Sequence, residues 1–180
     1  MPVAAPSIGS RLHFGLWLTL LFALSLPIGA EGLKFTLPDL AGRPVRLADF
    51  RGQWVIVNFW ASWCTPCLLE MPELESFHQA QRSRAVVIGV NFENLGPSEI
   101  RFFAERLGVT FPIVLSAGKL IPGFPLKGLP TTFLVSPSGA LADSYLGGVN
   151  AALLTARLTE LERTNGSSEP KAALPVHTQP

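Results

Sequence analysis

The only two cysteines of this 180-residue chain lie in the stretch WASWCTPCLLEMP, residues 60–72, with two residues between them. Such a pair can exchange disulfides, supply half of a metal site or form a structural cross-link. A chain with 48% hydrophobic residues can fold around a core of its own. A link between Cys64 and Cys67 would also constrain little of the unfolded chain. We therefore consider a purely structural disulfide a weak interpretation.

A zinc site is also a poor interpretation of the pair. Zinc binds about four protein ligands in its structural sites, and the chain has no second cysteine pair. The three histidines, His13, His78 and His177, lie near the start of the chain, in a predicted helix and near the end, without ligand spacing. We expect no metal and no organic cofactor, and redox chemistry at the cysteines is the remaining interpretation.

The elements around the pair favour that chemistry. Cys64 follows the apolar run WVIVNFW, typical of a buried strand, and opens a predicted helix from Thr65 to about Gln81. Free N–H groups and the helix dipole at such a position can lower a cysteine pKa from about 8.5 to roughly 3.5–7.5. Cys67 lies one turn further on the same face, where it can close a disulfide, and Pro66 suits the first turn.

The rest of the domain alternates between strand and helix patterns. The stretches LKFTL and VRL predict an N-terminal hairpin, AVVIGVNF a second buried strand and TFPIVL a short extended segment. Ser98 is the expected cap of a helix that ends at Gly108, and Asn150 is the expected cap of a final helix. A hairpin of TTFLVS and ALADSYLG lies between them. This order predicts an α/β fold with helices on both sides of a central sheet.

The two ends are expected to lie outside the fold. Residues 14–30, FGLWLTLLFALSLPIGA, carry no charge and follow Arg11, so residues 1–30 are predicted to be a signal peptide or an N-terminal membrane anchor. Residues 31–163 form the predicted domain, and residues 164–180 are predicted to be a disordered tail. The chain is thus expected to be exported. Its formal net charge of +1, without a basic stripe, argues against nucleic-acid binding.

Two stretches together resemble a known family. VNFWASWCTPCLLEMPEL and the later GLPTTFLVSPSG are similar to the thioredoxin superfamily, and within it to the TlpA/ResA-type thiol–disulfide oxidoreductases, over about residues 33–163. The resemblance implies a thioredoxin-like fold with a central mixed sheet and helices on both faces. It also implies an N-terminal β-hairpin extension and an extra helix and strand, residues 98–115.

The resemblance assigns roles around the cysteine pair. Cys64 would be the exposed attacking nucleophile and Cys67 the resolving thiol. Trp63 would shelter the pair and contact the protein partner. Thr65 and Pro66, between the cysteines, complete this side of the expected substrate-binding surface.

A second part of the expected binding surface is Leu129–Pro130. By resemblance this peptide bond would be cis and would expose the backbone of Leu129 to pair with a substrate strand. Base rates for X–Pro bonds alone favour an ordinary trans turn proline, and only the motif context reverses that.

One position departs from minimal thioredoxin, which has a buried aspartate six residues before the first cysteine. Here that residue is Asn58, which cannot take a proton. Glu70 is the candidate base for Cys67, because its side chain leans toward the preceding helical turn and ResA-like proteins carry a glutamate there. A solvated glutamate favoured by the helix dipole is the alternative.

The expected activity is dithiol–disulfide exchange by an exported enzyme, periplasmic or otherwise extracytoplasmic, with anchoring to the inner membrane left open. The family implies a dedicated reductant of client proteins such as apocytochrome c or copper-site proteins, with a membrane thiol transporter as electron donor. Two alternatives stay open. One is a thiol peroxidase of the AhpC/TSA-related group, and the other is a non-enzymatic Cu(I)-binding module that uses both thiols.

Overall fold

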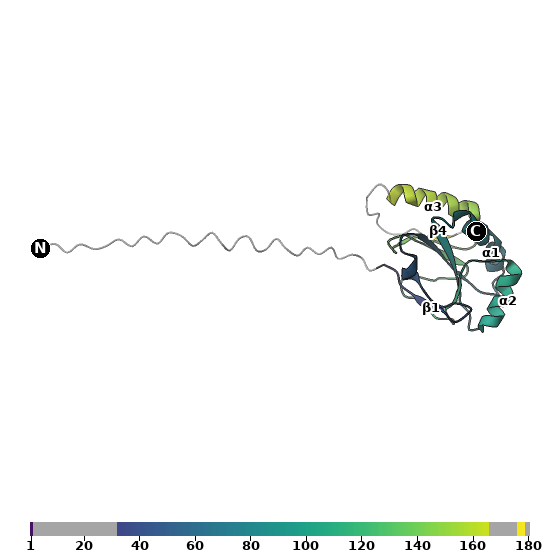
Figure 1. Ribbon diagram of the computed structural model, residues 1–180. Helices are drawn as coiled ribbons and strands as arrows, with labels where there is room; N and C mark the ends of the chain where they lie inside the picture. Colours follow the sequence, from purple (N-terminus) through teal and green to yellow (C-terminus); the bar gives the residue numbers. More distant parts are fainter. Residues whose placement is uncertain (2–31, 166–175, 179–180) are drawn as a thin grey trace. The chain divides into compact units, whose positions relative to one another are not determined.

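The computed structural model describes Met1, residues 32–165 and residues 176–178. Its centre is a mixed β-sheet with the strand order β5-β4-β3-β6-β7-β8. The strands are β3 (Trp54–Trp60), β4 (Ala85–Asn91), β5 (Ile113–Leu115), β6 (Thr131–Val135), β7 (Leu141–Leu146) and β8 (Val176–Thr178). The predicted thioredoxin-like α/β fold is confirmed (Figure 1).

The chain order of the elements explains the strand directions. Helix α1 (Thr65–Gln81) connects β3 to its parallel neighbour β4, and helix α2 (Pro97–Leu107) connects β4 to the parallel β5. Strand β6 then pairs with β3 in the antiparallel direction, and β7 returns beside β6 as a hairpin. Helix α3 (Ala151–Asn165) follows β7. The extra helix and strand expected before Pro130 are therefore α2 and β5.

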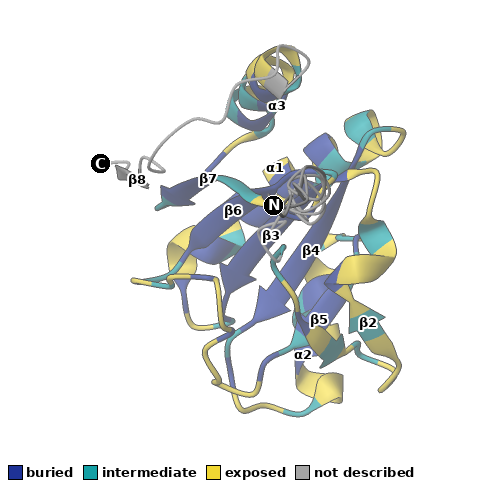
Figure 2. Ribbon diagram, turned by 90° about the vertical axis from the view of Figure 1, so that its left-hand side faces the viewer, coloured by how far each residue is buried: buried dark blue, intermediate teal, exposed yellow. Residues whose placement is uncertain are grey.

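The two faces of the sheet bury separate apolar clusters, because successive strand side chains alternate between the faces. Ile56 and Leu134 share one cluster with apolar residues of α1, α2 and α3. Val57 and Phe133 share the other with the 3-10 helix η1 (Leu47–Phe50) and with loop residues. Helices were expected on both faces of the sheet. On the second face, the helical cover among the described residues is the short 3-10 helix η1 alone. Figure 2 shows the buried strands between more exposed elements.

The predicted helix ends are confirmed with one exception. Gly108 ends α2 in the left-handed region, at φ 66°, and Asn150 Oδ1 accepts the Leu153 N–H at 2.8 Å at the start of α3. Ser98 was the wrong cap for α2. The N-cap residue is Gly96, whose N–H donates to Glu99 Oε2 at 2.7 Å. Ser98 lies inside the first turn of α2 and so does not occupy the cap position, and Glu99 in the same turn satisfies the N–H of the cap residue.

The segments near both ends differ in how far they can be described. The predicted N-terminal hairpin is formed by β1 (Thr36–Pro38) and β2 (Pro44–Arg46). The predicted leader, residues 1–30, lies outside the described residues except for Met1. In the predicted tail, the described residues Val176–Thr178 pair with β7 as the parallel strand β8. Within the described part of the chain, no helix is both long and apolar enough to cross a bilayer.

Candidate active site

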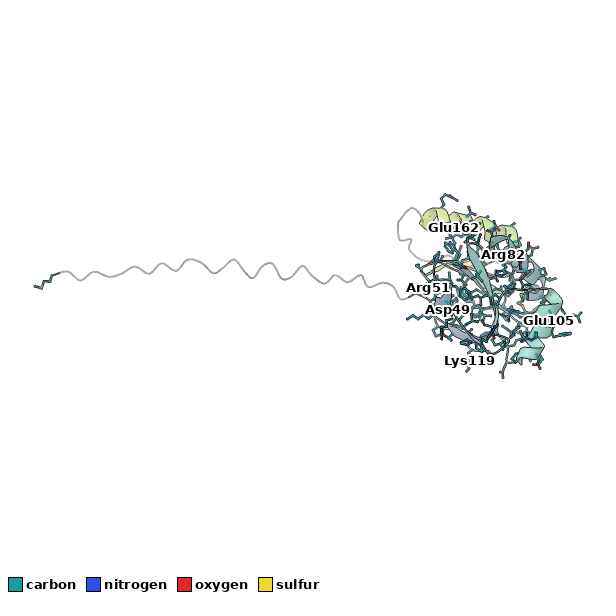
Figure 3. The ribbon with its side chains drawn as sticks, viewed as in Figure 1. Asp49, Arg51, Arg82, Glu105, Lys119 and Glu162 are labelled. Carbon is teal, nitrogen blue, oxygen red and sulfur yellow. A yellow bond between two sulfur atoms is a disulfide. The ribbon has the colours of Figure 1, made fainter. Side chains whose placement is uncertain are left out.

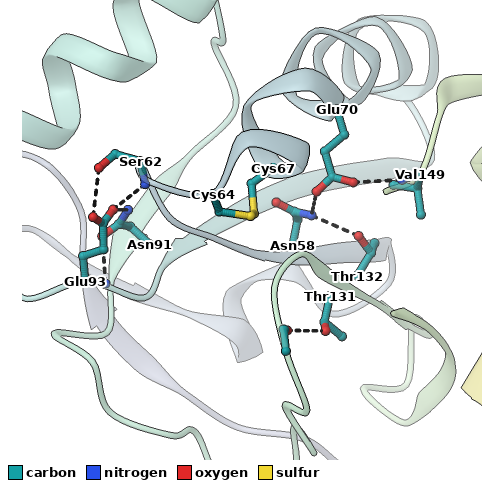
Figure 4. Close-up of a disulfide and its surroundings, with 11 residues drawn as sticks. Asn58, Ser62, Cys64, Cys67, Glu70, Asn91, Glu93, Thr131, Thr132 and Val149 are labelled. Carbon is teal, nitrogen blue, oxygen red and sulfur yellow. Dashed lines mark hydrogen bonds between the residues drawn. A yellow bond between two sulfur atoms is a disulfide. The ribbon is translucent and has the colours of Figure 1, made fainter. Parts of the chain in front are cut away.

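The cysteine pair lies at the carboxyl end of the central strand β3, where α1 begins. Cys64 is the N-cap residue of α1, and Pro66 occupies its first turn. Cys67 is one turn further, and the two sulfurs form a disulfide with the Cα atoms 5.2 Å apart (Figure 4). The sequence prediction that this pair can close a disulfide at a strand-to-helix turn is confirmed.

The two sulfur-bearing residues differ slightly in their access to solvent. Cys64 keeps only 5% of its surface exposed, so the nucleophile that was expected to be exposed is nearly buried in the disulfide form, and Cys67 has no exposed surface. Trp63 is 69% exposed, so most of its surface faces solvent. Thr65 and Pro66 are exposed beside it.

Strand register brings Pro130 to the same end of the sheet. Thr131, the first residue of β6, pairs with Phe59 near the end of β3. The residue before Thr131 therefore lies beside the strand end that leads into Cys64. The Leu129–Pro130 bond is cis, as predicted, and the Pro130 carbonyl accepts the Gly147 N–H at 3.0 Å.

Glu70 is a buried carboxylate one turn after Cys67. Its Oε1 accepts a hydrogen bond from Asn58 Nδ2 at 2.7 Å, and its Oε2 accepts one from the Val149 N–H at 2.8 Å. Burial raises the pKa of Glu70 to about 7, although the hydrogen bonds from Val149 and Asn58 act in the opposite direction. The alternative of a solvated helix glutamate is wrong, because only 3% of the residue is exposed.

Asn58 connects Glu70 to the neighbouring strand. It is fully buried in β3 directly opposite Thr132 of β6, and its Nδ2 donates to Thr132 Oγ1 at 3.0 Å as well as to Glu70. Its Oδ1 has no hydrogen-bond partner among the residues that the structure describes. From the sequence, Asn58 was expected only to be unable to take a proton, and neither Thr132 nor Val149 was predicted to belong to the site.

A second buried carboxylate fixes the loop in front of Cys64. Glu93 Oε2 accepts the Ser62 N–H at 2.6 Å, and Glu93 Oε1 accepts the Ser62 hydroxyl at 2.9 Å. Asn91 Nδ2 also donates to Oε2, at 2.8 Å. Glu93 was not predicted from the sequence, although an acidic residue two positions after a buried parallel strand is a signal that points to this end of the sheet.

Charge is otherwise kept at the surface. Asp49, Arg82 and Glu105, which Figure 3 labels, are exposed, and the only buried charged residues in the described part of the chain are Glu70, Glu93 and Asp143. Two of these three carboxylates thus lie close to the cysteine-bearing segment. In the same part of the chain, no three His, Cys, Asp or Glu side chains gather in a way that could hold a metal ion.

This arrangement agrees with comparisons to known proteins. Residues 28–144 match the AhpC/TSA family. The chain belongs to this family. The thiol-disulfide oxidoreductase ResA of Geobacillus thermodenitrificans is 39% identical over 127 residues, which are 68% of this chain and 71% of ResA. The chain is a thiol–disulfide oxidoreductase of the ResA/TlpA type, with Cys64 and Cys67 as its CxxC disulfide.

Solved structures agree with this assignment. StoA from Bacillus subtilis superposes with a TM-score of 0.58 at 29% identity, covering 72% of this chain and 96% of StoA. The exposed lipoprotein thioredoxin Etrx1 from Streptococcus pneumoniae superposes with a TM-score of 0.60 at 26% identity, covering 71% of this chain and 98% of Etrx1.

Proposed function

We propose that this chain is an extracytoplasmic reductant that transfers two electrons from the Cys64–Cys67 dithiol to a disulfide in a client protein. The observation that carries the proposal is the position of the pair. Cys64 caps α1 and retains the little exposure that the pair has, while Cys67 is fully buried beside the carboxylate network of Glu70. This asymmetry suits one attacking and one resolving thiol.

The reaction then runs in two exchanges. The Cys64 thiolate attacks one sulfur of the client disulfide, that bond breaks, and a mixed disulfide forms while one client thiolate leaves. The Cys67 thiolate attacks Cys64 Sγ, which releases the second client thiolate. The client gains two electrons, and the Cys64–Cys67 disulfide forms, the state that the structure holds. A membrane thiol transporter, as electron donor, would reduce the pair again.

Glu70 is the proposed base for the second exchange. Cys67 must lose its proton in a buried position, where the charged thiolate is disfavoured. A carboxylate whose pKa lies at about 7 can take a proton near neutral pH and return it afterwards. Its place on α1, one turn from Cys67, supports a direct transfer or a transfer through one water.

The proposed client surface consists of Trp63, Thr65, Pro66 and the Leu129–Pro130 bond. Exposure of the first three supports contact with a partner. The backbone of Leu129 forms no hydrogen bond to any other described residue, which leaves its N–H and C=O free to pair with an extended client segment. By family resemblance the clients are apocytochrome c or copper-site proteins.

Location outside the cytoplasm is part of the proposal. It is supported by the uncharged residues 14–30 and by the similarity to Etrx1, which is described as an exposed lipoprotein. Residues 1–30 are proposed to direct export, either as a cleaved signal or as an anchor.

The test is to trap the client. Cells that express full-length Cys67→Ser are expected to accumulate mixed disulfides with client proteins, whereas Cys64→Ser forms none. Purified reduced protein should then reduce the trapped client. If neither variant forms mixed disulfides and the wild type does not reduce any trapped or supplied apocytochrome c, the reductant proposal is wrong.

The AhpC/TSA match gives one specific reason to test a second activity, that of a thiol peroxidase. Such an enzyme would consume hydrogen peroxide in the presence of a thiol reductant. Peroxide consumption that outpaces client reduction would favour the peroxidase over the reductant.

A further inference from the structure

Among the described residues, only the NH₂ group of the Asn58 side-chain amide has hydrogen-bond partners. Nδ2 donates to Glu70 Oε1 and to Thr132 Oγ1, at 2.7 and 3.0 Å. Oδ1 is buried and has no partner among the described residues. A buried carbonyl oxygen without a hydrogen-bond donor has lost its hydrogen bonds to water and has gained none within the protein. Such a group is unfavourable and rare in native proteins. This acceptor therefore needs an explanation.

The disulfide lies on the unpartnered side of the amide. Figure 4 shows Asn58 Oδ1 on the side toward Cys64 and Cys67, and Nδ2 on the side toward Glu70 and Thr132. When Glu70 is ionised it also fixes this orientation, because an ionised carboxylate only accepts hydrogen bonds and so selects the NH₂ end of the amide.

The missing donor appears when the pair is reduced. A disulfide sulfur carries no hydrogen and cannot donate, whereas a thiol is a weak donor. Cys67 is fully buried on the same face of the sheet, so its thiol is shielded from bulk water and needs an acceptor within the protein.

We propose that Asn58 Oδ1 accepts a hydrogen bond from the Cys67 thiol in the reduced protein, and so stabilises the dithiol state. The inference deepens the proposed function and rests on its dithiol chemistry. When a donor dithiol reduces the pair, the Cys64–Cys67 bond breaks and the donor is oxidised to a disulfide. Both electrons and both protons of the donor pass to the two cysteine sulfurs. The hydrogen that Cys67 gains is the one that Asn58 accepts.

The first experiment uses the unmodified chain. The side-chain carbonyl carbon of Asn58, Cγ, is followed by ¹³C NMR before and after reduction with dithiothreitol. A new hydrogen bond to Oδ1 is expected to move the Asn58 Cγ signal downfield. Asn91 is the internal control, because its Oδ1 already accepts the Glu93 N–H at 3.1 Å and its Nδ2 donates to Glu93. If Asn58 Cγ moves no more than Asn91 Cγ, the inference is overturned.

The second experiment measures the reduction potential of the full chain against a glutathione or dithiothreitol buffer. In Asn58→Leu the acceptor is absent, so the disulfide is expected to become about tenfold harder to reduce, a fall of about 30 mV for a two-electron couple. The matched control Thr132→Val removes one hydrogen bond from Nδ2 but leaves Oδ1 in place, and should keep the wild-type potential. Equal potentials for Asn58→Leu and Thr132→Val would contradict the inference.

These two measurements do not depend on any client. If the Asn58 signal shifts but the protein reduces no client disulfide, the hydrogen bond is supported and the proposed function is wrong. If the protein reduces clients but the Asn58 signal does not shift, the proposed function is supported and the hydrogen bond is wrong.

Discussion

Glu70 is the group at this site whose pKa is shifted furthest toward neutral pH, and its replacement with glutamine removes that titrating group. Burial raises its pKa from 4.5 to about 7 in the folded protein. The unfolded chain exposes the same carboxyl to water, where its pKa is ordinary. A difference of this size corresponds to about 3 kcal/mol of unfolding free energy, at about 1.36 kcal/mol for each pH unit.

The sign follows from which state binds the proton more tightly. Between pH 4.5 and about 7 the folded protein keeps the Glu70 proton while the unfolded chain releases it. Stability therefore falls as pH rises through this window, and the loss is complete above it. Glu70→Gln cannot titrate. The unfolding free energy of the wild type, measured relative to this variant, should thus fall by about 3 kcal/mol between pH 4.5 and 8.

Urea unfolding of the oxidised proteins at several pH values tests this prediction. Neither cysteine titrates in the disulfide form, so taking the difference between variant and wild type isolates Glu70. Glu73→Gln is the matched control. Glu73 lies on the same helix and accepts the Ala151 N–H at 3.1 Å, but it is exposed. The reasoning is refuted if the difference between the wild type and Glu70→Gln does not change over this pH range, or if Glu73→Gln gives the same profile.

The same substitution tests the chemical role of Glu70. With glutamine in place of the base, the resolving attack by Cys67 should slow by roughly 10²-fold or more, while the initial attack by Cys64 continues. Stopped-flow release of client from a preformed mixed disulfide measures the resolving step alone. In the wild type its rate should rise with pH through about 7, and this inflection should be absent in the variant. An inflection that persists in Glu70→Gln would assign the proton to another group.

Three further predictions concern residues around the site. In the reduced protein, an alkylating agent near neutral pH should modify Cys64 faster than Cys67, which mass spectrometry after a short pulse would reveal; faster labelling of Cys67 would reverse their roles. Trp63→Ala should change the free energy of unfolding by less than about 0.5 kcal/mol and leave the reduction potential unchanged, yet lower the second-order rate with client, because the side chain is 69% exposed. Asp143→Ala removes the buried partner of Arg157, which keeps its ion pair with the half-exposed Glu160, and should cost about 1–3 kcal/mol in urea unfolding without moving the potential; a shifted potential would connect this pair to the site.

Much of the fold could be predicted because its elements follow strong local patterns. The continuous apolar run WVIVNFW became β3, buried along its whole length, and α1 spans the predicted range from Thr65 to Gln81. Gly108 and Asn150 were found as helix ends because only a few residue types suit those positions. Ser98 was misassigned because Glu99, its neighbour, can satisfy the same end of the helix by another route.

The site was only partly predictable, because its polar contacts depend on strand register and burial. Cys64, Cys67 and Pro130 could be found from spacing and motif. The pairing of Asn58 with Thr132 spans 74 residues, and the bond from Val149 to Glu70 spans 79, distances over which no local pattern acts. The exposure of Trp63 likewise depends on what fails to pack over it. Reactive residues can thus be predicted from sequence more easily than the residues that position them.

In minimal thioredoxin the buried acid lies on the strand, whereas here Asn58 occupies that strand position and the buried acid, Glu70, lies on the helix. An aspartate at position 58, as in minimal thioredoxin, would place a second carboxylate within hydrogen-bond distance of Glu70 Oε1, where the asparagine amide now lies at 2.7 Å. Two buried carboxylates at such a distance cannot both ionise, so one would be held neutral near pH 7. With asparagine, the strand instead supplies an NH₂ that stabilises the ionised Glu70 and a carbonyl that faces the cysteines. The neutral amide on the strand is thus compatible with the proposed role of Glu70 as the base on the helix.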